Sequence, residues 1–302
     1  MNPEEKSTEE NGSEPLSADQ IDEMADDDIM KNEWDRVEGW PRSDRYRFCP
    51  LSLEDWILLC CMADIPHVGA NHVIDFERND VMHYDKRGPH QQRIHTALEL
   101  LKHFKRPNHM YRWDCCSDYY IKSSMAKGDF EWNEKFLEID IGDIRTQEIL
   151  YDYPRFVVPV FSRPWLTPWL IDNYPVEYRV YVDDGVIMGV SNYYPQRPIP
   201  EIPEHLKAVQ DLTEKLMKHM PDPPWQVGNV VQQKDAHDLG SVMSGTPRMS
   251  DGIHFTADFI VSLEGEVLFL EGGPPHRIDY GAHPCCFLAG DIDGIALEDR
   301  NE

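Results

Sequence analysis

Apolar side chains recur along this chain with two different periods, which predict both helices and strands. A spacing of three or four residues, typical of an amphipathic helix, occurs in three segments. The predicted helices are residues 51–62, 90–104 and 203–220. Ser52 is expected to cap the first helix, and Pro107 and Pro221 are expected to end the second and the third.

Shorter runs rich in β-branched and aromatic residues predict strands. One hairpin is expected around Asp183-Asp184-Gly185, as a three-residue loop with Gly185 in the left-handed conformation. Ser162–Pro168 is expected to be a rigid linker, and residues 225–250 are expected to be a loop. The expected strands are residues 68–76, 110–114, 118–123, 156–161, 177–182 and 186–191.

A second predicted hairpin, near the C-terminus, brings two acidic residues together. Its strands are residues 255–263 and 266–270, and Glu264-Gly265 is expected to be a two-residue loop because glycine accepts the positive φ of tight turns. In that register Asp258 faces Glu271, with the two carboxylates roughly 5 Å apart. Like charges at this distance repel, so the pair is expected to hold a cation, and Mg²⁺ with nucleotide phosphates is commonly held in this way.

The same register pairs Ile260 with Phe269 and places both on the face of Asp258 and Glu271. A different arrangement of this hairpin is also open. Glutamate is a poor first residue for the tightest hairpin turn, and a longer loop or a bulge would turn one of the two acids to solvent.

Two basic residues are candidates for contacts with phosphate. Lys122 ends a predicted strand beside small residues, although most lysines are simply solvated. Arg179 lies in mid-strand, on the same predicted face as Glu177 and Tyr181. An arginine in that setting is either one half of a buried ion pair or a holder of an anionic phosphate.

Composition limits the class of protein and its partners. The chain has 302 residues, 41% of them hydrophobic, which suffices for one large domain or two small ones. The formal net charge is −26, of which residues 1–40 carry −11 through 14 acidic residues against three basic ones. Residues 1–40 are expected to be a disordered acidic tail, either merely solvated or binding a partner, and residues 291–302 a second acidic tail. A chain so acidic is expected to repel nucleic acid and anionic lipid.

The cysteines and the apolar runs predict a reduced, cytoplasmic setting. Six of the seven cysteines fall in adjacent pairs, which is no disulfide framework. No apolar run reaches the roughly 20 residues that span a bilayer, and the N-terminus is too acidic and polar for a signal peptide. A zinc site is conceivable, but with a spacing atypical for structural zinc, at His276, His283, Cys285 and Cys286.

Taken in order, these features resemble the ATP-grasp fold over residues 110–290. They are Lys122, the apolar strand with its linker, Glu177-x-Arg179 on a hairpin, a helix, and Asp258 with Glu271-Gly272-Gly273-Pro274 on the last hairpin. Three segments of the chain resemble a poorly characterised, phage-associated branch of that superfamily: Arg112-Trp113-Asp114, Glu177–Val182 and Ser191–Tyr194. The chain is also similar to the eukaryotic cell-division-cycle protein 123 family, an ATP-binding assembly factor for translation initiation.

The resemblance implies an α+β fold of antiparallel sheets with packed helices in residues 110–290, preceded by a small mixed α/β region in residues 41–109. It implies ATP and Mg²⁺ as cofactors, with Asp258 and Glu271 holding the metal. At the phosphates it implies Lys122 and Arg112 beside the α- and β-phosphates and Arg179 beside the γ-phosphate. At the adenine it implies that the backbone of Pro159, Val160 and Phe161 through Arg163 contacts the edge of the ring. Ile260 and Phe269 would pack against the adenine. Lys122 and Arg179 would serve catalysis.

The activity implied is that of an ATP-dependent ligase, which joins the carboxylate of a protein, peptide or small molecule to an amine or thiol through an acyl-phosphate. One position departs from the family pattern, because Gly273 stands where an asparagine usually supplies a further metal ligand. A non-catalytic ATP-binding assembly or chaperone-like factor with a protein partner is therefore the alternative. A third interpretation, from the acidic charge, is a decoy that mimics DNA.

Overall fold

The structure is a computed structural model of the 302-residue chain. The chain divides into two units, residues 1–46 and 47–302, and all residues described below belong to the second. The described residues are 48–84, 88–104, 106, 109–116, 141, 146–147, 149–150, 153–164, 175–193, 202–230 and 246–274. They combine helices with antiparallel sheets, which confirms the predicted α+β class.

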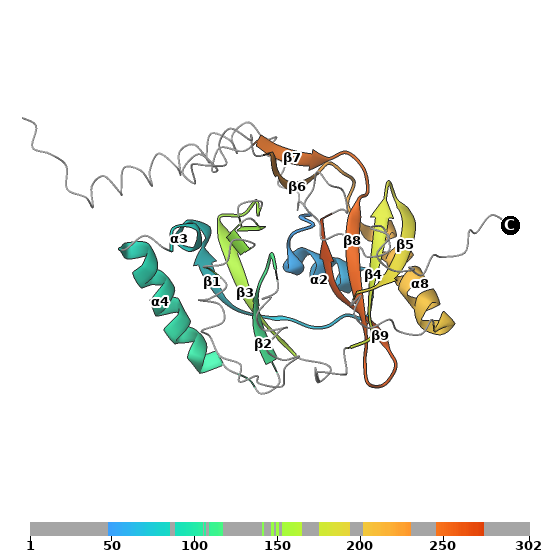
Figure 1. Ribbon diagram of the computed structural model, residues 1–302, viewed down its shortest axis with the longest axis horizontal. Coiled ribbons are helices and arrows are strands. Elements are labelled where there is room, and N and C mark those ends of the chain that lie inside the picture. The colour runs from blue at the N-terminus through green and yellow to red at the C-terminus, as the bar shows by residue number, and fades with distance from the viewer. Residues whose placement is uncertain are drawn as a thin grey trace, which may run out of the picture. The chain divides into compact units, whose positions relative to one another are not determined.

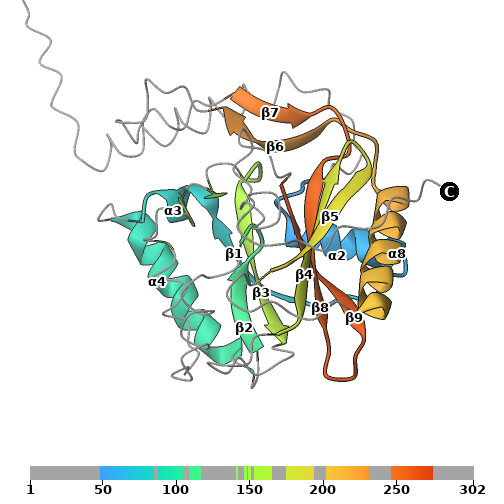
Figure 2. The ribbon, with the colours of Figure 1, turned by 45° about the vertical axis from the view of Figure 1, so that its right-hand side comes forward.

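A four-stranded antiparallel sheet carries the two predicted hairpins (Figure 1). Its strands, in spatial order, are β5 (Val186–Asn192), β4 (Glu177–Asp183), β8 (Phe255–Val261) and β9 (Val267–Gly273). Two helices, α2 (Leu53–Met62) and α8 (Pro203–His219), pack their apolar residues against one face of this sheet (Figure 2). The other face of the sheet is left for polar side chains.

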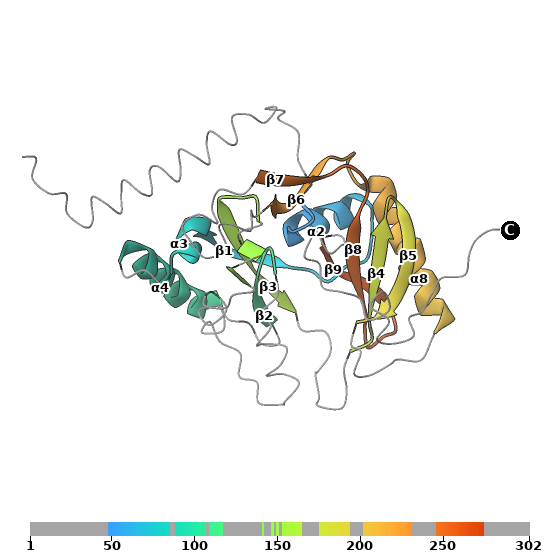
Figure 3. The same cartoon turned by 45° about the horizontal axis from the view of Figure 1, so that its top comes forward.

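A three-stranded antiparallel sheet lies beside it (Figures 1 and 3). Its order is β1 (Asn71–Glu77), β3 (Val157–Pro164) and β2 (His109–Trp113), so β3 is central. The sheet shares a second apolar core with α4 (Pro89–Leu101), which η1 (Lys102–Phe104) extends, and α3 (Arg78–Met82) precedes α4. A separate two-stranded ribbon is formed by β6 (Trp225–Val230) and β7 (Thr246–Ser250).

The helices form where the sequence predicts them, for the expected reasons. The Ser52 side chain accepts a hydrogen bond from the Asp55 backbone N–H at 3.2 Å and so caps α2. Glu54 and Asp55 lie in the first turn, where the helix dipole favours negative charge. Helices α4 and α8 each begin with a proline, whose missing N–H costs nothing at that position.

Three sequence predictions about the strands are wrong in detail. Ser162–Pro164 is not a linker but the end of β3, where Ser162 pairs with residues of both β1 and β2. Residues 225–250 are not all loop, because they contain β6 and β7. The β4–β5 turn has two residues rather than three, and both Asp184 (φ 49°) and Gly185 (φ 72°) take the positive φ that such a turn requires. The predicted strand 118–123 lies outside the described residues.

The β8–β9 hairpin confirms one predicted pair and corrects the other. Asp258 does pair with Glu271, but Phe269 pairs with Phe259 rather than with Ile260. The loop is longer than predicted, because Ser262 donates its backbone N–H to the Glu266 carbonyl at 2.8 Å. A bulge between the Phe259 and Asp258 pairs then shifts the register by one residue. The longer loop shifts the pairing register by one residue and the bulge shifts it back, so Asp258 and Glu271 face each other as predicted.

The first core is organised around Trp56 of α2. The indole is fully buried, and its ring lies 4.8 Å from Phe48, 5.3 Å from Phe255 and 5.6 Å from Phe269, measured between centroids. Its Nε1–H donates to the Pro50 carbonyl at 2.9 Å, so the polar atom is satisfied. The indole also lies directly on the backbone of β9 at Gly272, where a Cβ would be 2.0 Å from a ring carbon.

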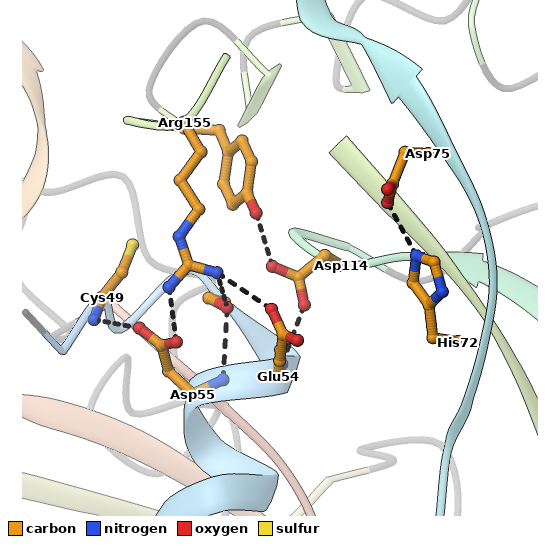
Figure 4. Close-up of polar contacts among 9 residues, drawn as sticks. Cys49, Glu54, Asp55, His72, Asp75, Asp114 and Arg155 are labelled. Carbon is orange, nitrogen blue, oxygen red and sulfur yellow. Dashed lines mark hydrogen bonds and ion pairs between the residues drawn. The ribbon is translucent and has the colours of Figure 1, made fainter. Parts of the chain in front are cut away.

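A buried hydrogen-bond network joins the start of α2 to the strands of the three-stranded sheet (Figure 4). Asp114, which follows β2, accepts from the Glu54 backbone N–H at 2.8 Å and from the Tyr153 hydroxyl at 2.6 Å. Arg155, which precedes β3, contacts the carboxylates of Asp55 and Glu54. Because α2 belongs to the core of the other sheet, this network links the two sheets through the buried side chains of Asp55, Asp114 and Tyr153, with Arg155 and Glu54 at its more exposed edge.

The contact between Gly272 and Trp56 leads to a prediction about stability. We expect Gly272→Ala to lower the free energy of unfolding by about 1–3 kcal/mol, because the new methyl group would push the indole out of a packed core. Urea unfolding followed by tryptophan fluorescence measures the change. Gly69→Ala is the matched control, since a Cβ there meets nothing within 4 Å. Equal losses in the two variants would contradict the packing argument.

Candidate functional site

The face of the four-stranded sheet opposite the apolar core carries charged residues. Along β4, Tyr178, Val180 and Val182 are buried in the core, so Glu177 and Arg179 lie on the other face, as predicted. Arg179 on β4 pairs directly with Asp258 on β8, and Asp258 pairs with Glu271 on β9. Antiparallel pairing therefore places a guanidinium and two carboxylates in a row across three adjacent strands.

Arg179 and Asp258 form a two-point ion pair. The Arg179 Nε donates to Asp258 Oδ1 at 2.7 Å, and Nη2 donates to Oδ2 at 2.6 Å. Burial alone would lower the pKa of Arg179, but the charge and hydrogen bonds of Asp258 outweigh it, so the pKa of Arg179 is held well above its usual range. The ring of Tyr193 covers the guanidinium at 4.6 Å from its centroid, an arrangement that favours the cation.

Glu271 has an arginine partner of its own, which comes from the other sheet. Arg112 on β2 is 4% exposed and donates through Nη1 to Glu271 Oε2. Its Nε donates to the Trp113 carbonyl at 3.1 Å. Burial opposes the charge of Arg112, but Glu271 outweighs burial and raises the pKa of Arg112 above its usual value. The cation that the two carboxylates require is thus supplied, in this structure, by two guanidinium groups.

A third arginine completes the set. Arg163 on β3 is 3% exposed and donates through Nη2 to the carbonyls of Val68, at 3.1 Å, and of Leu270. Burial and then the neighbouring charge of Arg112 lower the pKa of Arg163 to about 9. The six charged residues of this region, called the charged layer below, are Arg112, Arg163, Glu177, Arg179, Asp258 and Glu271.

The structure places the predicted adenine contacts less favourably. Ile260 is on the face of the charged layer, where it pairs with Glu177 of β4. Phe269 is not on that face: it is fully buried in the apolar core, 5.7 Å from Phe259 between ring centroids, so it cannot pack a ligand held by the charged layer. The bulge at Leu270 is the reason, because the residues of β9 between the bulge and the loop point to the opposite face from the one that an unbulged strand would give them.

The residues of the predicted hinge lie within a sheet. Pro159, Val160 and Phe161 are buried within β3, the central strand of its sheet, with pairing partners on both sides. A strand paired along both edges has its backbone groups engaged in the ladder, and a ligand edge would have to compete with neighbouring strands. Lys122 lies outside the described residues, as do the cysteine and histidine residues of the conceivable zinc site.

Sequence reasoning missed the ring of Tyr193 and the guanidinium of Arg163, a residue that it placed at the site only through its backbone, as the end of the hinge. The sequence predicts a linker at Arg163 because the segment that follows the strand 156–161 contains Pro164 and Pro168, which are typical of turns and are rare in central strands. The alternation of Phe161 with Arg163 was the available signal, since residues two apart share a face. Tyr193 follows directly after β5, and nothing in the sequence pattern points to its contact with Arg179.

Two wider searches of the described part of the chain bear on the site. It contains no group of three or more His, Cys, Asp or Glu residues arranged to hold a metal ion. None of its helices has the length and apolar character that crossing a membrane would require.

Comparison with known proteins gives similarity at the level of structure. No protein-family model matches the sequence, and no curated protein matches it. Among solved structures, C-terminally truncated Cdc123 from Schizosaccharomyces pombe aligns at 8% identity over 76% of this chain and 87% of that chain, with a TM-score of 0.44. D-Alanine-D-alanine ligase from Helicobacter pylori aligns at 12% identity over 74% of this chain and 51% of that chain, with a TM-score of 0.37.

A third match is the ATP-grasp ligase PsnB complexed with a minimal precursor, Mg and ADP, at 10% identity over 80% of this chain and 57% of that chain, with a TM-score of 0.32. The chain is thus similar in structure to Cdc123 and to ATP-grasp ligases, both of which its sequence resembles, whereas none of these matches concerns the phage-associated branch. TM-scores below 0.5 do not transfer the activity of these proteins to this chain, and its chemistry has to be argued from the charged layer.

The ion pair between Arg179 and Asp258 can be tested by neutralising its members singly and together. We expect Arg179→Gln and Asp258→Asn each to lower the free energy of unfolding by roughly 3–5 kcal/mol, because each removes the opposite charge that balances a buried charged group. The double variant is expected to lose less than the sum, a coupling that a double-mutant cycle from urea unfolding measures. The exposed pair Lys207–Asp211 on α8 is the control, with a coupling below about 1 kcal/mol. Additive losses at Arg179 and Asp258 would refute the pairing.

Proposed function

We propose that the charged layer binds ATP with Mg²⁺ and that this protein is an ATP-dependent ligase, which joins a carboxylate to an amine or thiol. The observation that carries the proposal is the direct opposition of Asp258 and Glu271 on adjacent strands, each with an arginine beside it. Carboxylates in opposition suit a divalent cation, and arginines around them suit phosphate.

The donor set fits magnesium. Mg²⁺ is usually held by one or two carboxylates and completes its octahedral shell with waters and substrate phosphates. A carboxylate has about four lone-pair sites, so Asp258 and Glu271 can bind a cation while keeping hydrogen bonds to Arg179 and Arg112. In this proposal Asp258 and Glu271 hold the metal, as the sequence predicted.

The arginines fit the phosphate chain. Guanidinium groups bind phosphate through two parallel hydrogen bonds, and both Arg112 and Arg179 are held in place at the charged layer by contacts with protein. Arg112 comes from the three-stranded sheet and Arg179 from the four-stranded sheet, so a nucleotide bound by both would bridge the two sheets. Ile260 is the apolar residue placed to contact the base from the same face.

Bound Mg-ATP would supply the phosphoryl group that activates a substrate carboxylate. The contribution of this chain would be positioning and charge neutralisation: Asp258 and Glu271 fix the metal, and Arg179 stabilises the negative charge that develops at the transferring group. This chemistry needs no nucleophile from the protein. The acceptor would be a protein, a peptide or a small carboxylate.

A second candidate function is an ATP-binding assembly factor without turnover, and Gly273 favours it. Gly273 pairs with Thr256 next to Glu271, where a side chain would complete the metal site, and a Cβ added there would meet Thr256 Oγ1 at 3.0 Å. The strand therefore offers one metal ligand at this end rather than two. A site with fewer ligands can hold nucleotide for conformational or partner binding and yet transfer no phosphate.

Nucleotide binding is tested by thermal unfolding with and without Mg-ATP. We expect Mg-ATP to raise the melting temperature of the wild type, because a ligand that binds only the folded state stabilises it by mass action. The shift should be lost in the variant that carries both Arg179→Gln and Asp258→Asn, which removes the pair without leaving either charge unpaired. The Lys207→Gln/Asp211→Asn variant, neutralised at an exposed pair on α8, should keep the full shift. No shift in the wild type would refute the proposal.

Turnover separates the two candidate functions. If the protein is a ligase, it should release ADP from Mg-ATP in the presence of a carboxylate and an amine or thiol acceptor, and Glu271→Gln should reduce that release at least a hundredfold, on the order of the loss of one essential electrostatic contact. ADP is measured by a coupled assay against a series of candidate carboxylates. Binding of Mg-ATP without ADP release, together with recovery of a protein partner that depends on Mg-ATP, would instead identify the assembly factor.

A further inference from the structure

Among the described residues, Arg163 is the arginine of the charged layer for which no ion pair with an acid is seen. Ion pairs join Arg112 to Glu271 and Arg179 to Asp258. For Arg163 the described part of the chain shows none, and its contacts are the neutral carbonyls of Val68 and Leu270. Its Nε is buried and has no hydrogen-bond partner. Within the described part of the chain, this guanidinium is 3% exposed and forms no ion pair with a carboxylate.

This arrangement is costly for the folded protein. A buried cation that lacks a counter-charge loses the hydration it has in water, and carbonyl dipoles restore only part of it. Arg112 adds repulsion, which together with burial accounts for the lowered pKa of Arg163. Two acids oppose these effects from a distance, Glu271 and Glu177, but Glu271 is already engaged by Arg112.

The position of Arg163 relates this unbalanced charge to the proposed nucleotide site. Arg163 pairs with Met110, and Phe161 pairs with Arg112, so Arg163 and Arg112 lie on the same face of neighbouring strands. One of its two carbonyl partners, on Leu270, directly precedes Glu271. Arg163 therefore stands beside a proposed metal ligand, on the side of the layer that the three-stranded sheet contributes.

We propose that Arg163 binds the phosphate chain of the nucleotide together with Arg112, and that the bound phosphate is the paired counter-charge that the described residues do not supply to this buried guanidinium. This inference rests on the proposed function, because it assigns a further binding residue to the same site. It also distinguishes the arginines: Arg179 and Arg112 contact the metal carboxylates as well as the phosphate chain, whereas Arg163 is ion-paired with none of the described carboxylates and offers its free donor to the ligand.

A purely structural role is the competing explanation, and it makes different predictions. Leu270 is the extra residue of the β9 bulge, so its carbonyl has lost its place in the ladder and Arg163 satisfies it. If that were the whole role of Arg163, its replacement would lower stability and leave the preference for phosphorylated ligands unchanged.

The experiment is isothermal titration calorimetry of the full chain with Mg-bound non-hydrolysable ATP, Mg-ADP and adenosine. For Arg163→Gln we expect Kd for the ATP analogue to rise roughly tenfold to a hundredfold, the loss of a charged hydrogen bond, while Kd for adenosine stays unchanged. Arg163→Lys keeps the charge but loses the fork, and we expect a rise between those of the wild type and Arg163→Gln. Should Arg163→Gln fail to fold, Arg163→Lys alone decides the question.

Arg78→Lys is the matched control. Arg78 is also a buried arginine that donates to a backbone carbonyl, that of Tyr153 at 3.1 Å, but it belongs to α3, outside the charged layer. Its replacement should leave every Kd unchanged. An Arg163→Lys variant that binds the ATP analogue as tightly as the wild type, or one that loses adenosine and ATP analogue equally, overturns the inference and leaves the proposed function standing. A wild type that binds none of the three ligands overturns both.

Discussion

The buried pairing of arginine with carboxylate between the two sheets is the constraint on which the rest of the site depends. Asp258 and Glu271 repel one another, and each is stable in its buried place because a guanidinium neutralises it. Arg112 reaches Glu271 from a strand of the three-stranded sheet, so Glu271 is neutralised only while that sheet holds Arg112 beside the four-stranded sheet. The side-chain network around Asp114 holds that position, because it fixes the end of β2, two residues from Arg112, to the start of α2.

The sequence predicted much of the fold because local signals and tertiary packing agree there. Ser52 caps α2, prolines begin α4 and α8, and Gly185 sits in a tight turn, all through interactions within a few residues. The opposition of Asp258 and Glu271 was predicted correctly, but through two errors that cancelled. A signal for the bulge was present, since Val267, Phe269 and Glu271 occupy alternate positions, and two buried apolar residues do not share a core face with an acid.

The remainder could not be predicted, for reasons that lie outside any local pattern. Arg112 and Arg179 were expected at the site, but a single sequence does not say that Arg112 pairs with Glu271 across two sheets or that Arg179 pairs with Asp258. A metal was inferred where the structure has guanidinium groups, because either cation relieves the same repulsion. The role of β3 was hidden by its prolines, and with it the place of Arg163.

The bulge at Leu270 has a consequence for how this hairpin can change in evolution. The hairpin could be built in two forms. One form has a two-residue loop and no bulge, and the other, seen here, has a three-residue loop and a bulge. In both forms the two acids face each other and are separated by the same number of residues. What differs between the two forms is the residue that enters the core, which is one position before the second acid in the unbulged form and two positions before it here. A relative could thus alternate between these solutions and keep its charged pair, and a comparison that aligns the acids would then misalign the core.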